Sequence, residues 1–202
     1  MKNKYYIIIV LIVSFLGTSS YLIINAAKSA TRTKPPIIST LSHVEFESSD
    51  GSIFTNEDFK GRVTVLDFMF TSCQGPCPIM AVNMASLYRK YKVIPKVQFL
   101  SITVDPDFDT NEVLNNYALM NGVNDQRWKF LRSDMDKLKA ISEEKFKFYA
   151  KDLPAGHSVK FILIDSEGNI RQYYDGTDKA SMMILQSHIN LFLEDLQLIN
   201  EA

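Results

Sequence analysis

The chain holds two cysteines, Cys73 and Cys77, and both lie in the stretch FMFTSCQGPCPIM. Residues i and i+4 share one face in helical geometry, so the two thiols can point in the same direction. With Cα atoms about 6 Å apart they could form a disulfide, and the same sulfurs could converge on one metal ion. The spacing therefore allows a redox pair, a metal site or a structural disulfide.

A structural disulfide is the least favoured of these three. Proteins outside the cytoplasm do use disulfides for stability. Closing so short a loop, however, constrains the unfolded chain little, so the stabilisation would lie at the low end of the usual range. Redox chemistry and metal binding both use the thiolate form of cysteine, so one environment could serve either purpose.

The segments around the cysteines predict a strand followed at once by a helix. Residues 63–70 (VTVLDFMF) are almost wholly apolar, as in a central strand buried on both faces. Residues 78–92 begin with proline, carry apolar residues at helical spacing and end in basic residues. The carboxyl edge of such a strand is the usual ligand site of α/β sheets. The positive end of the helix should lower the pKa of a thiol at that edge.

The rest of the chain continues this alternation. A hairpin is expected at 44–54 and a short turn at 56–61. Further strands are expected at 97–104, 128–131, 159–164 and 169–174, and helices at 110–119, 134–146 and 179–196. Strand–helix alternation implies a parallel core, to which the late hairpin adds antiparallel strands. The order predicts an α/β protein with a thioredoxin-like fold and an N-terminal β-hairpin extension.

One of the three histidines is a candidate partner for the thiols. His157 lies in LPAGHSVKFILI, immediately before an expected strand, and in a thioredoxin-like fold the loop entering this strand lies beside the cysteine loop. Two thiolates and an imidazole suit Cu(I), and they can also hold Cu(II) or Zn(II). His43 is expected at the surface or in the hairpin, and His188 within the last helix, in packing or facing solvent.

Three motifs in the same order resemble the SCO/SenC family of copper-binding cytochrome oxidase assembly proteins. They are FTSCQGPCP at the cysteines, SITVDPDFDT after the second central strand, and GHSVKFILIDSEG at the histidine. The resemblance runs from about residue 41 to residue 196, together with the N-terminal apolar segment. Two features depart from the usual family pattern, namely Gln-Gly-Pro between the cysteines and Gly156 before the histidine.

The resemblance implies a copper chaperone with Cys73, Cys77 and His157 as copper ligands and Asp105 near the site. Such a protein would assist assembly of the binuclear copper centre of the oxidase. Its partners would be a copper-accepting oxidase subunit and a copper donor or a thiol–disulfide reductant. From the residues alone, Asp105-Pro106 could instead end a strand and open a turn, and Asp109-Thr110 reads as a helix cap.

The N-terminus predicts a membrane segment. No charge occurs from Tyr5 to Ala27, and a helix of that length can cross a hydrocarbon layer of ~30 Å. An uncleaved anchor is favoured over a signal peptide, because apolar character resumes at residues 21–24. The expected domains are an anchor or signal segment at 1–28, a linker at 29–40 and a thioredoxin-like, copper-binding domain at 41–200.

Composition narrows the location and the partners. The formal net charge is −1, and the basic residues of the N-terminal segment leave the remainder of the chain more acidic than basic. Nucleic acid is therefore not an expected partner, since phosphate binding needs a basic face. The globular part is expected outside the cytoplasm, at the periplasmic face of a bacterial inner membrane rather than in mitochondria.

Two enzymatic functions compete with the chaperone. A thiol–disulfide oxidoreductase would use one thiolate to attack a partner disulfide and the other to resolve it, and that chemistry does not require His157. A peroxidase would need a threonine and arginine environment around its cysteine. Thr71 precedes Cys73 by two residues, but no arginine lies near the motif, so this function is the weakest.

Overall fold

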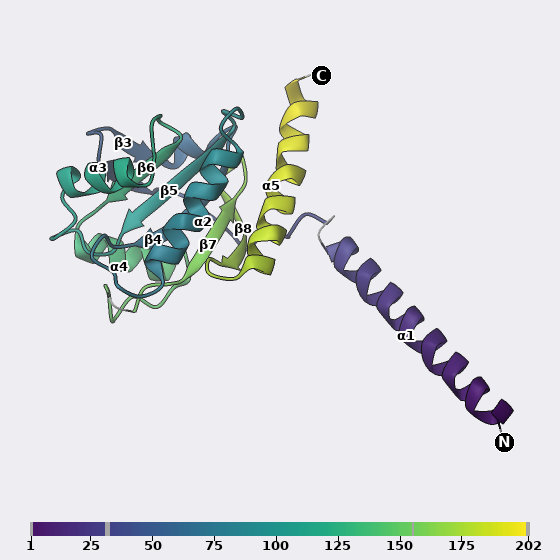
Figure 1. The fold of residues 1–202 in the computed structure, drawn as a ribbon. Coiled ribbons are helices and arrows are strands. Elements are labelled where there is room, and N and C mark those ends of the chain that lie inside the picture. Colours follow the sequence, from purple (N-terminus) through teal and green to yellow (C-terminus); the bar gives the residue numbers. More distant parts are fainter. Residues whose placement is uncertain (1, 31–32, 155, 201–202) are drawn as a thin grey trace. The chain divides into compact units, whose positions relative to one another are not determined.

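The computed structural model describes residues 2–30, 33–154 and 156–200, and the chain divides into two compact units, residues 1–34 and 35–202 (Figure 1). The first unit consists of helix α1 (Lys2–Ala30). Within α1 the stretch Tyr5–Ile23 is long and apolar enough to cross a membrane, and none of it is buried.

The second unit is built on one mixed sheet with the strand order β1-β8-β7-β4-β5-β6-β2-β3. Strands β4, β5 and β6 are parallel to one another, and the other neighbouring pairs are antiparallel. The bounds are β1 (Ser39–Thr40), β2 (Glu45–Ser48), β3 (Ile53–Thr55), β4 (Val63–Met69), β5 (Val97–Thr103), β6 (Trp128–Arg132), β7 (Lys160–Ile164) and β8 (Asn169–Asp175).

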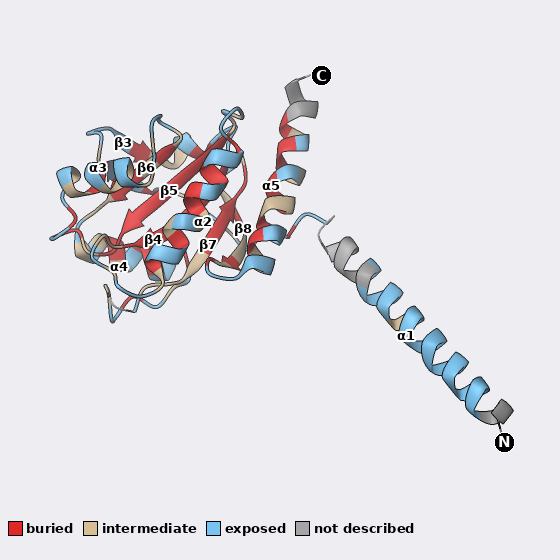
Figure 2. Cartoon of the chain, viewed as in Figure 1, coloured by how far each residue is buried: buried red, intermediate tan, exposed pale blue. Residues whose placement is uncertain are grey.

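Helices cover the sheet from both faces. They are α2 (Cys77–Lys90), α3 (Asn111–Met120), α4 (Met135–Glu144) and α5 (Lys179–Asn200), with a short 3₁₀ helix η1 (Asn56–Phe59). Buried side chains of α2, α3 and α5 share one core cluster, and those of α4 and the β2–β3 hairpin share a second on the other face. Every residue of β4 and β5 is buried, as Figure 2 shows, so both strands lie between the two cores.

The predicted parallel core, the N-terminal hairpin and the late antiparallel hairpin are all present. The expected turn at 56–61 contains the helix η1, and α2 begins at Cys77 instead of residue 78. The second difference matters for function, because it makes one thiol-bearing residue the first residue of the helix.

The predicted linker at 29–40 is wrong in its second part. Ser39–Thr40 form β1, which pairs with β8, and the backbone N–H of Ile38 donates to Ile170 O at 2.8 Å. Arg171 Nε donates to Pro35 O at 2.8 Å, so the compact unit begins at Pro35 instead of residue 41. A two-residue strand is too short to show an alternation of apolar and polar residues, and its partner strand lies far along the sequence. The residues alone therefore do not predict this pairing.

Candidate metal centre

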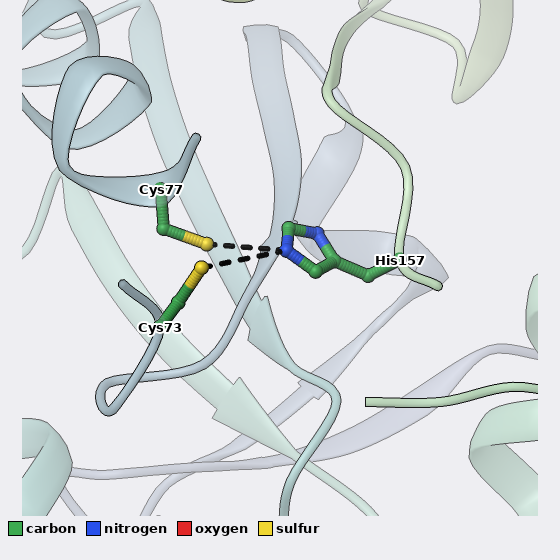
Figure 3. Close-up of side chains that lie close together, drawn as sticks. All are labelled: Cys73, Cys77 and His157. Carbon is green, nitrogen blue, oxygen red and sulfur yellow. Dashed lines mark hydrogen bonds between the residues drawn. The ribbon is translucent and has the colours of Figure 1, made fainter. Parts of the chain in front are cut away.

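Cys73, Cys77 and His157 come together at the carboxyl edge of β4 (Figure 3). Their ligand atoms all lie within 4.8 Å of one another. His157 Nε2 is 3.2 Å from Cys77 Sγ and 4.0 Å from Cys73 Sγ. Among the residues that the structure describes, this is the cluster of metal-ligating groups that the sequence analysis singled out.

The two thiols come from one short connection between β4 and α2. Cys77 is buried as the first residue of α2, and Cys73 is half-buried in the loop before it. Both are free thiols. Pro76 occupies the N-cap position of α2 and makes no side-chain cap.

The expected lowering of the thiol pKa is wrong for Cys77. Burial, and to a smaller extent the hydrogen bond with Cys73, raise the pKa of this thiol to about 12. A hydrogen bond with the Phe70 backbone acts in the opposite direction but is outweighed. The helix N-terminus is present as predicted. Removal from water and a second sulfur alongside outweigh its field, because both disfavour a thiolate without a compensating cation.

His157 belongs to the loop between α4 and β7 and presents a lone pair to the thiols. Its Nδ1 is 3.1 Å from Ser158 O, and because a carbonyl only accepts, Nδ1 carries the proton. Burial lowers the pKa of the imidazole, which favours the neutral form. Nε2 is then an acceptor facing both sulfurs. The ring of Phe70 packs edge-on against the imidazole ring, with 5.3 Å between the ring centroids. A hydrogen bond on Nδ1 that leaves Nε2 available is how metal-ligating histidines are usually oriented.

The dimensions of this cluster fit a metal ion. Bonds of ~2.3 Å to sulfur and ~2.0 Å to nitrogen place these atoms roughly 3.5–3.8 Å apart around one ion. The observed separations of 3.2 and 4.0 Å fall on either side of that range. The donor set of two sulfurs and one imidazole is soft, which favours Cu(I) and excludes hard ions such as Mg²⁺ or Ca²⁺.

The cysteines also line an open groove of about 230 Å³ between α2 and α3, together with Phe70, Tyr117 and Met120. His157 instead borders a separate small cavity, which Phe68, Phe148 and Leu153 also line. A group that approaches the cluster from solvent therefore meets the thiols through the groove.

The other two histidines lie apart from the cluster. His43 is exposed with a positive φ of 57°, just before the β2–β3 hairpin, so its expected surface position is confirmed. His188 is buried in α5, where its Nδ1 is 2.6 Å from Tyr174 Oη. Of the two alternatives predicted for His188, packing or facing solvent, the structure shows packing.

Asp105 lies in the loop after β5 and is not part of the three-residue cluster. Its backbone N–H donates to Thr103 Oγ1 at 3.0 Å. Burial raises the pKa of its carboxyl, and the neighbouring Asp109 and Asp107 raise it further. Its role near the site stays a prediction.

Two acidic residues have roles that the sequence analysis missed. Asp109, interpreted as part of a helix cap, is fully buried and accepts hydrogen bonds from Thr71 and Thr103, whereas Thr110 caps α3. Asp67 is buried within β4, and Ser101 Oγ donates to its Oδ1 at 2.6 Å. An acid in the middle of the apolar run VTVLDFMF was the available signal for Asp67.

The chain belongs to the SCO1/SenC family. The model of this family matches residues 38–189, which cover both cysteines and the histidine. The predicted family is therefore confirmed, and the match covers most of the second compact unit.

Solved structures place the fold in the same family. A SCO1/SenC family lipoprotein from Bacillus anthracis is 31% identical, covers 77% of this chain and 95% of its own, and superposes with a TM-score of 0.71. BsSco is described as a member of the Sco family of cytochrome c oxidase assembly proteins with a disulfide switch; it is 24% identical over 79% of this chain and 97% of its own, with a TM-score of 0.68. Copper-bound ScoI of Bradyrhizobium japonicum is 22% identical over 73% of this chain and 94% of its own, with a TM-score of 0.59. The predicted thioredoxin-like fold is confirmed.

Proposed function

We propose that this protein is a copper chaperone in which Cys73, Cys77 and His157 bind one copper ion for assembly of the binuclear copper centre of cytochrome c oxidase. The observation that carries the proposal is the convergence of two free thiols and the Nε2 lone pair of a neutral imidazole. The family match supports it, as do the copper in the ScoI structure and the assembly function given for BsSco.

The chemistry of the three side chains explains how copper would be taken up and released. Copper is the cargo here, and binding it requires both thiols to lose their protons. Because the pKa of Cys77 is high without a cation, the bound ion itself has to drive that loss. His157 is already neutral and needs no such change. Release is a ligand exchange, in which a donor atom of the acceptor enters through the groove beside Cys73.

The proposed location is the outer side of a membrane. The apolar stretch Tyr5–Ile23 in α1 would serve as the anchor, and the second compact unit would lie in the periplasm of a bacterium. A copper-accepting oxidase subunit and a copper donor or thiol reductant would be the partners at that surface.

A second candidate function is thiol–disulfide exchange, which the free thiol pair and the disulfide switch described for BsSco favour. The half-buried Cys73 would attack a partner disulfide, form a mixed disulfide and release one partner thiol. The buried Cys77 would then attack Cys73 Sγ and release the second. Two electrons pass to the partner, which leaves as a dithiol, and the Cys73–Cys77 pair is oxidised to a disulfide.

Anaerobic titration of the reduced full chain in detergent with Cu(I), against a competing chelator, separates the two functions. We expect one tight equivalent in the wild type. Loss of that equivalent in Cys77→Ser and a weaker one in His157→Ala are expected from the three-ligand site. The variant His43→Ala removes a histidine outside the cluster and should bind as the wild type does.

Tight Cu(I) binding that is unchanged in His157→Ala would contradict the three-ligand site. Absence of tight copper binding, together with a disulfide that partner-like dithiols reduce readily, would move the assignment to thiol–disulfide exchange.

A further inference from the structure

The loop that carries Cys73 is tied to the neighbouring strand by a buried carboxylate. Thr71 stands two residues before Cys73, and its backbone N–H donates to Asp109 Oδ2 at 3.1 Å. The Thr71 hydroxyl donates to the same carboxylate. Asp109 has no exposed surface, so these bonds form out of contact with water, where each is stronger than at the surface.

The same carboxylate reaches the end of the adjacent strand. Thr103 is the last residue of β5, and its hydroxyl also donates to Asp109. The backbone N–H of Asp109 donates to Asp105 O at 2.9 Å, which fixes the aspartate within its own loop. Asp109 therefore joins the loop that leaves β4 to the loop that leaves β5, at the edge where the thiols lie.

The two thiols are consequently held in two different ways. Cys77 belongs to α2, and the helix sets its position. Cys73 lies outside the helix, and its backbone N–H makes a hydrogen bond of 3.3 Å to Phe70 O. Two residues before Cys73, the hydrogen bond of Thr71 with Asp109 ties this loop to the loop that follows β5.

We propose that Asp109 is a positioning residue that sets the place of Cys73 relative to Cys77 and His157. As far as copper is concerned, the inference rests on the proposed function. It assigns the third aspartate of the VDPDFDT motif to support of the cysteine loop. The hydrogen bonds of Asp109 described above go to Thr71, Thr103 and Asp105, and not to the candidate ligands. The effect on the site passes through Thr71.

Replacing the carboxylate by an amide should break this arrangement. Asp109 accepts from one N–H and two hydroxyls. In Asp109→Asn one oxygen becomes an NH₂ group, which cannot accept and faces donors instead. At least one buried donor then loses its partner, so the loop has to move to recover a hydrogen bond. Loss of groups that orient metal ligands typically lowers metal affinity by about 10–100-fold, and we expect that range here.

The test uses the full chain in detergent and two readouts. The first is the rate at which iodoacetamide alkylates Cys73 relative to Cys77 in reduced, metal-free protein, followed by peptide mass spectrometry. The second is Cu(I) affinity. Asp107→Asn is the matched control, because it removes the same charge from the same loop at an exposed position. Thr71→Val removes only the hydroxyl contact, and Thr71→Ser retains it.

We expect Asp109→Asn to change the Cys73-to-Cys77 alkylation ratio and to lower Cu(I) affinity about 10–100-fold. Thr71→Val should shift both readouts in the same direction by less, while Thr71→Ser and Asp107→Asn stay at the wild-type values. An Asp109→Asn protein that folds and keeps both wild-type values overturns the proposal. So does a loss of stability with an unchanged alkylation ratio, since that is what a merely structural residue would give.

Two further outcomes are also decisive. If Asp109→Asn does not fold, the alkylation ratio of Thr71→Val decides, with a shifted ratio supporting the proposal and a wild-type ratio overturning it. If the wild type binds no Cu(I), the proposed function fails, but the metal-free alkylation ratios still test the positioning role by themselves.

Discussion

The candidate site is assembled from two halves that are held by different interactions. We call residues 70–77 the thiol half and residues 145–159 the imidazole half. The thiol half connects β4 directly to α2 and is tied to the next strand through Asp109. The imidazole half connects the end of α4 to the start of β7, and its described residues, 145–154 and 156–159, form no helix or strand.

Apolar contacts anchor the imidazole half. Phe146 is fully buried with its ring edge-on to Phe68 at 5.1 Å, and Phe148 meets the same ring at 5.8 Å. Tyr173 Oη donates to Phe146 O at 3.1 Å. Closer to His157 the backbone hydrogen bonds are local, such as Gly156 N–H to Asp152 O at 2.8 Å.

The ligands of one site therefore need not share one kind of support. Directional hydrogen bonds and a helix fix the sulfurs, whereas burial of aromatic rings fixes the segment that delivers the nitrogen. The two halves should therefore respond to different substitutions, and each of the following predictions tests that separation.

The largest effect is expected from the aromatic anchor. Phe146→Ala should lower the free energy of unfolding by about 3–5 kcal/mol, because it removes a fully buried ring and leaves a cavity. Denaturant unfolding of the reduced protein measures it. Tyr149→Ala is the control, since that ring is 65% exposed and should cost about 0.5 kcal/mol or less. Equal losses in the two variants would show that the loop does not depend on its buried ring.

A pH-dependent effect is expected on the side of the thiol half. Burial raises the pKa of Asp67 from 3.8 to about 7, so the folded state holds a proton that the unfolded chain has already lost. Stability should then fall as pH rises between these two values, by about 3 kcal/mol from pH 5 to pH 8. Asp67→Asn should remove this fall, since the amide oxygen can still accept from Ser101.

Thermal and denaturant unfolding of the reduced, metal-free wild type and Asp67→Asn at pH 5 and pH 8 measures the difference in their free energies of unfolding. The difference between wild type and Asp67→Asn should be larger at pH 8. A constant difference would mean that Asp67 keeps the same charge in both states of the chain, contrary to the effect of its burial.

The smallest effect is expected from two glycines, one in each half. A Cβ at Gly156 would lie 3.1 Å from Asp152 Cβ and 3.3 Å from Asp152 O, so the loop has to shift. A Cβ at Gly75 meets Cys73 Sγ at 3.8 Å, an ordinary contact. Gly156→Ala should therefore lower Cu(I) affinity by less than about tenfold and Gly75→Ala by less still. The reverse order would contradict the view that the thiol half has the room and the firmer support.

The elements and the three candidate ligands could be predicted from the residues alone. Hydrophobic alternation and apolar runs report local burial, so the central strands and the main helices were readable to within a few residues. The spacing of the cysteines and the order of the three motifs led to His157, although it lies 80 residues from Cys77.

Features that depend on residues distant in the sequence became visible only in the folded chain. Strand β1 forms because it pairs with β8. The pKa of Cys77 rises because the fold buries the thiol. Asp109 accepts a hydrogen bond from Thr71 because β4 and β5 end side by side. Desolvation and pairing between separate segments are properties of the packed chain, and no periodicity in the sequence encodes them.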